Sequence, residues 1–66
     1  MRAIRIEPQL CTATRNGDIN AMQDLIDHGA DVNQAKDDGT TPLYIAAENG
    51  HVNAMQFLIA SGADVN

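Results

Sequence analysis

LCTATRNGDINAMQDLIDHGADVN (residues 10–33) and LYIAAENGHVNAMQFLIASGADVN (residues 43–66) are one stretch of sequence written twice, 33 residues apart. Of the 24 aligned pairs, 15 are identical, and the alignment needs no gap. Agreement over such a length indicates a duplicated structural unit. A period between about 20 and 50 residues is typical of a stacked array of helical or strand repeats.

Glycines divide each copy into two short segments. Gly17 pairs with Gly50, and Gly29 pairs with Gly62. Glycine adopts the left-handed conformation that ends a helix at little steric cost, so each copy is expected to hold two helices, each followed by a glycine. The second helix of the second copy is predicted over residues 52–60. Its apolar residues fall on one face at helical spacing: Val52, Met55, Leu58 and Ile59.

Local signals mark where the helices begin. Thr41 followed by Pro42 predicts an N-cap and a first helical residue, because proline lacks the N–H that would stay unpaired there. Asp18 is a predicted N-cap for the second helix of the first copy. Between the copies, Asp38-Gly39 is a tight-turn dipeptide. The segment AKDDGTT is therefore predicted to form a projecting, hairpin-like loop.

The second copy resembles an ankyrin repeat. The resemblance rests on GTTPLYIAAENGH (residues 39–51) and on GADVN (residues 62–66) at the family's spacing. The first copy keeps GADVN but reads EPQLCTATRNGD before it, a form similar to the opening repeats of ankyrin arrays. Tyr44 departs from the family pattern, which usually has a histidine there that shares a hydrogen-bond network with the nearby Thr41.

The resemblance implies an all-α ankyrin fold, in which two stacked helix-turn-helix pairs are joined by the projecting loop. The expected parts are an N-terminal arm (residues 1–6), a first repeat (7–35) and a second repeat (36–66). The arm has two open interpretations: its alternating isoleucines cover the first helix pair, or it is disordered.

Length and charge narrow the function classes. A chain of 66 residues forms one small domain, and helices this short depend on packing against neighbours. The net charge is −5, with +2 on residues 1–15 and −7 on residues 16–66. Nucleic-acid binding needs lysine and arginine to displace counterions, so the acidic body argues against it.

Membrane and secretory functions are also disfavoured. The chain has no apolar run as long as a membrane span, and its arm lacks the apolar region of a signal peptide. One cysteine makes no internal disulfide and agrees with a reducing compartment. The expected location is intracellular, in the cytoplasm.

No residue pattern supports catalysis, a metal or a cofactor. Cys11 is expected to be an ordinary thiol on a helix. His28 lies near Asp27 and Asp31 in the sequence, but a zinc site needs three or four ligands at set spacings, and the chain's histidines and cysteine are few and widely separated.

The ankyrin resemblance implies a protein–protein interaction module whose partner contacts the hairpin tip and the first helices. An acidic surface of this kind predicts a partner with a basic or polar patch. The candidate contact residues are Arg15, Asn16, Asp37, Asp38, Thr40, Tyr44, Glu48 and Asn49. His28 and Ser61 are weaker candidates for contact with the partner.

The second repeat has no recognisable capping repeat after it, and three explanations stay open: a fragment of a longer array, self-association through the open face, or a weakly folded single chain. The first two explanations give the alternative functions. As a fragment, the chain would be part of a larger ankyrin-containing protein or effector whose activity lies elsewhere; if it self-associates, it would be a homo-oligomer unit.

Overall fold

The computed structural model describes residues 7–64, so the predicted arm and the last two residues lie outside the described part of the chain. Within it the chain forms only helices and connecting loops, which confirms the predicted all-α class. The helices are α1 (Gln9–Arg15), α2 (Ile19–Asp27), α3 (Pro42–Glu48) and α4 (Val52–Ala60).

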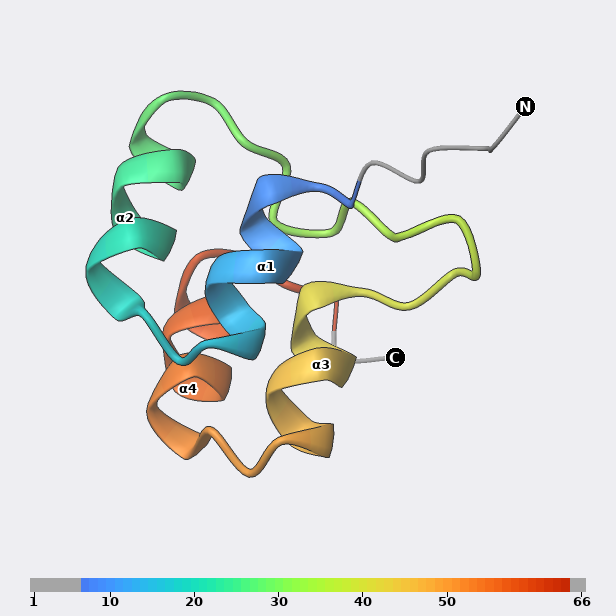
Figure 1. The fold of residues 1–66 in the computed structure, drawn as a ribbon. Helices are drawn as coiled ribbons and strands as arrows, with labels where there is room; N and C mark the ends of the chain where they lie inside the picture. The colour runs from blue at the N-terminus through green and yellow to red at the C-terminus, as the bar shows by residue number, and fades with distance from the viewer. Residues whose placement is uncertain (1–6, 65–66) are drawn as a thin grey trace.

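The helices form two pairs that stack side by side (Figure 1). Within each pair the helices pack against one another, α1 on α2 and α3 on α4. Between the pairs, α1 packs on α3 and α2 packs on α4. Because each helix has only seven or nine residues, these contacts rather than helix propensity hold the fold together.

The predicted helix starts are confirmed by their hydrogen bonds. The Asp18 carboxylate accepts from the Ala21 N–H at 3.1 Å and caps α2. The Thr41 hydroxyl accepts from the Tyr44 N–H at 3.3 Å, with Pro42 as the first residue of α3. His51 occupies the N-cap position of α4, but its side chain makes no capping bond and instead contacts the first pair.

The loop before α3 has the predicted hairpin-like form and extends away from the helices (Figure 1). The Lys36 N–H donates to the Thr40 carbonyl at 2.8 Å, and the Gly39 N–H donates to the Lys36 carbonyl at 2.9 Å. Gly39 has a φ of 86°, a conformation that the turn requires and that side-chain-bearing residues rarely adopt.

A small aliphatic core lies where the four helices meet. It consists of Leu10, Ala13, Met22, Ala46, Ala54 and Leu58. The apolar face predicted for α4 is only partly used: Leu58 is buried, whereas Val52 and Ile59 are 59% and 47% exposed. The helix predicted over residues 52–60 is confirmed, and α3 and α2, the helices on which it packs, leave these two apolar residues exposed.

Candidate functional site

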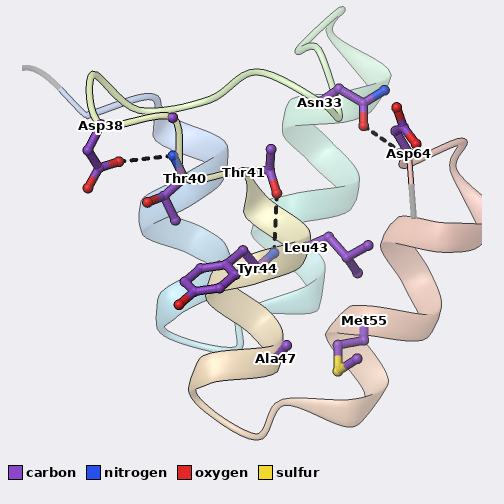
Figure 2. Close-up of a pocket in the computed structure, with 10 residues that line it drawn as sticks. Asn33, Asp38, Thr40, Thr41, Leu43, Tyr44, Ala47, Met55 and Asp64 are labelled. Carbon is purple, nitrogen blue, oxygen red and sulfur yellow. Dashed lines mark hydrogen bonds between the residues drawn. The ribbon is translucent and has the colours of Figure 1, made fainter. Parts of the chain in front are cut away.

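A groove of about 750 Å³ opens where the hairpin loop meets the second helix pair. Figure 2 shows its residues, which come from the loop, from α3, from α4 and from the segments that follow α2 and α4. We call it the end groove. It is lined by Asn33, Asp38, Gly39, Thr40, Thr41, Leu43, Tyr44, Ala47, Met55 and Asp64.

The helices supply the apolar part of the end groove. Successive turns of α3 place Leu43, Tyr44 and Ala47 along it, and α4 contributes Met55 (Figure 2). Tyr44 is 60% exposed, while Leu43 and Met55 are half-buried. An aromatic residue this accessible is a typical anchor for a partner, because tyrosine often contributes much of the binding energy at interfaces.

Carboxylates stand at the edge of this apolar surface. Hydrogen bonds from Thr40 lower the pKa of Asp38, so its carboxylate is ionised at neutral pH. The Lys36 ammonium lies 4.0 Å from Asp38 but 3.6 Å from Glu7, so it offsets the charge of Asp38 only in part. Across the groove, the Asp64 N–H donates to the side-chain oxygen of Asn33 at 2.7 Å, which ties the ends of the two repeats together.

The structure separates the predicted contact residues into two groups. Three line the end groove, namely Asp38, Thr40 and Tyr44, and the exposed Asp37 precedes them in the loop. The other four lie at the C-terminal ends of the first helices of each pair: Arg15, Asn16, Glu48 and Asn49.

Within the second group, two side chains already have partners in the fold. Both terminal guanidinium nitrogens of Arg15 donate to the Glu7 carboxylate, at 2.5 and 2.6 Å. The Asn49 amide donates to the Ile45 carbonyl at 2.8 Å. Asn16 and Glu48 are exposed. A partner that used Arg15 would therefore have to compete with Glu7.

The remaining polar candidates stand apart from the end groove. His28 and Ser61 are the C-cap residues of α2 and α4, and the His28 ring lies 2.7 Å from the Asp24 carbonyl.

The Cys11 thiol is buried, which raises its pKa, and it lies 3.7 Å from the Gln34 carbonyl. Within residues 7–64, histidine, cysteine and acidic side chains form no cluster suited to a metal ion.

Sequence reasoning named as contact residues only three of the ten residues that line the groove. Met55 was expected only on the apolar face of its helix, Leu43 was seen only within the motif of residues 39–51, and Asn33 and Asp64 were seen only as parts of the GADVN motif. A signal for them existed in the duplication itself. Leu43 and Met55 are identical to their counterparts 33 positions earlier but less buried, and that difference is visible only once the stacking order is known.

The comparisons with known proteins agree with this architecture. A family model described as "Ankyrin repeats (3 copies)" matches residues 7–66, over which the structure holds two helix pairs. A search among curated proteins finds no match. None of the helices in residues 7–64 combines the length and the apolar character needed to cross a membrane. Because the family model covers all but the first six residues, the chain belongs to the ankyrin repeat family.

Proposed function

We propose that this chain is a recognition module that binds a partner protein through the hairpin tip and the first-helix surface, and that it is not an enzyme. Ankyrin repeats generally serve protein–protein interaction and are typically non-enzymatic scaffolds. The observation that carries the proposal is the exposed Tyr44 in one groove with the exposed Asp38, on a surface formed by a hairpin and a helix.

The proposed partner carries a basic or polar patch. Residues 16–66 hold eight acidic residues and one lysine, a net charge of −7. Charges of one sign on a recognition surface speed the approach of oppositely charged partners and lose strength as salt screens them. The proposed contact set is the predicted one: Arg15, Asn16, Asp37, Asp38, Thr40, Tyr44, Glu48 and Asn49.

The proposal includes the organisation of the chain and its setting. Repeats at residues 7–35 and 36–66 form one scaffold, with the hairpin at the start of the second repeat. The buried, unpaired thiol of Cys11 fits a reducing compartment, and we place the module in the cytoplasm.

A photo-crosslinking amino acid in place of Asp37 tests the recognition surface. In cell extract it should capture a defined partner, and excess unlabelled chain should compete with the capture. The same crosslinker in place of Asn20, which is exposed on α2, is the matched control. Changing Asp38→Asn and raising the salt concentration should both weaken capture. Equal capture from Asn20, or stronger capture at high salt, would contradict the proposal.

A further inference from the structure

The two repeats cover their equivalent positions to different extents. The apolar residues of the end groove have counterparts 33 positions earlier, and those counterparts are between 0% and 2% exposed. The pairs are Leu10 with Leu43, Cys11 with Tyr44, Thr14 with Ala47, and Met22 with Met55. In the first repeat this surface lies beneath α3 and α4. The end groove is thus the second repeat's counterpart of a surface that helices cover in the first repeat.

The covering of the first repeat also uses a polar contact at its edge. His51 Nε2 lies 2.9 Å from the Arg15 carbonyl, and because a carbonyl only accepts, the ring nitrogen donates. The same ring lies 3.1 Å from where a Cβ on Gly17 would be. In the second repeat the equivalent hydrogen-bond acceptor is the Glu48 carbonyl, close in sequence to Gly50. Gly50 has nearly the same φ as Gly17, 70° against 68°, yet nothing lies within 4 Å of its Cβ position among the described residues.

A second copy of this chain is poorly suited to cover the end groove. Four positions that are buried or half-buried in the second pair are polar and exposed in the first repeat, so the first repeat of another copy has a polar surface where the second pair has side chains that pack. The pairs are Pro42 with Gln9, Ile45 with Thr12, His51 with Asp18, and Phe57 with Asp24.

Pairing two end grooves face to face is disfavoured by charge. Each copy would bring Asp38 and Asp64 into the contact, and each carries a net charge of −5. Like charges brought together at an interface weaken association.

The acidic rim favours a cationic occupant instead. Asp38 and Asp64 stand at the hairpin end of the groove. Glu48, which follows the groove residue Ala47 at the end of α3, occupies the position that Arg15 holds in the first repeat, so the charge there is reversed between the copies. A lysine or arginine can donate to both a carboxylate and a backbone carbonyl, which is the combination that Glu48 offers.

We propose that the end groove is the docking site for an amphipathic helix of the partner, whose apolar side chains cover Leu43, Tyr44, Ala47 and Met55 while its lysine or arginine residues face the acidic rim. This inference rests on the proposed recognition function and gives it a location and a ligand class. The helical form of the occupant follows from the way α3 and α4 cover the equivalent surface.

Two designed helical peptides of about 18 residues test the proposal, a length at which an isolated helix can form. Both carry one leucine face, with lysine flanks in the first and glutamate flanks in the second. Added to the ¹⁵N-labelled full chain, the lysine peptide should shift the amide resonances of Leu43, Tyr44, Ala47 and Met55. The glutamate peptide should not.

Ala47→Glu and Ala60→Glu form the matched pair of variants. Both alanines are exposed in the last turn of a helix, but only Ala47 lines the groove. Ala47→Glu should weaken the lysine peptide by about tenfold, or 1.4 kcal/mol, through the bulk it adds to the groove floor. Ala60→Glu should leave the affinity unchanged.

Three results would overturn the inference. Equal binding of both peptides would remove the role of charge. Groove resonances that change with protein concentration alone would make a second copy the occupant. Binding that is lost in Asp37→Asn but kept in Ala47→Glu would assign recognition to the hairpin tip, so that the proposed function stands and the docking site does not.

Discussion

Met22 and Met55 occupy the same place in two helices that both read NAMQ, yet Met22 is fully buried and Met55 only half-buried. The local sequence cannot cause this difference. Met22 lies in the core where the two pairs meet, whereas Met55 only packs against that core and also lines the end groove. Position in the stack therefore decides burial, so the same residue type fills the core in the first repeat and lines a groove in the second.

The positions at which the copies differ show the complementary effect. Asp24 is exposed on α2, while its counterpart Phe57 is half-buried and packs on the core. Asp18 caps its own helix, while its counterpart His51 reaches across to the Arg15 carbonyl. The first repeat is thus polar on the side where the second is adapted for contact, which gives the stack a direction.

The largest expected effect comes from truncating the two methionines. Met22→Ala removes a fully buried side chain and should cost about 2–5 kcal/mol of unfolding free energy. A domain of this size has only about 3–5 kcal/mol in total, so this variant should be largely unfolded. Met55→Ala should cost about 1 kcal/mol or less, because its side chain is partly solvated already. Urea unfolding followed by circular dichroism measures both.

Equal losses in the two variants would contradict the difference in burial. A loss at Met55 as large as that at Met22 would mean that the end groove is covered in solution, and the dependence of that loss on protein concentration would show whether another copy covers it.

A smaller effect is expected from replacing the paired glycines Gly17 and Gly50. Both have φ near 70°, so alanine at either position should lower the unfolding free energy by about 1–2 kcal/mol through backbone strain. At Gly17 the added methyl also meets the His51 ring, which must move and loosen its bond to the Arg15 carbonyl. Gly17→Ala should therefore exceed Gly50→Ala by about 1 kcal/mol, the net value of a hydrogen bond.

The control for this comparison is a His51→Ala background, in which the extra cost of Gly17→Ala should vanish. An extra cost that persists without the ring would show that the two glycines differ in backbone strain alone, and that the His51 contact does not distinguish the two repeats.

Much of the fold could be predicted from the sequence, because its helix limits depend on residues close together in the chain. Thr41 caps α3 and Asp18 caps α2 through groups three residues away. The turn at Gly39 likewise closes between Lys36 and Thr40. Such short-range signals are written in the sequence itself.

The candidate site was harder to predict because it depends on distant contacts. Asp38, Thr40 and Tyr44 were chosen by family position, and they do line one groove. The pairing of Arg15 with Glu7 spans eight residues and crosses from a helix to the segment before it, so no periodicity indicates it. The apolar part of the groove is formed by residues whose exposure depends on which side of the stack they face.

The smallest expected effect concerns the way the first helix is anchored. Hydrogen bonds from Arg15 and then from Thr12 lower the pKa of Glu7 to about 2. The counterpart of Glu7 in the second repeat is Thr40, so this ion pair belongs to the first repeat alone. A carboxylate with a depressed pKa in the folded state stabilises the fold above its unfolded pKa of roughly 4.3. That stabilisation is lost as the pH falls from there towards 2.

Glu7→Gln should therefore flatten the loss of stability between about pH 4.3 and pH 2. The difference from the unmodified chain at neutral pH should be about 1 kcal/mol or less, because the Arg15 side chain is 40% exposed and water screens the pair. Urea unfolding at a series of pH values measures the slope. Arg15→Gln should reduce it similarly, and the double variant should add little, since both changes remove one interaction. Additive losses would mean that each residue stabilises the first repeat separately, and that Arg15 is more available to a partner than its bonds to Glu7 suggest.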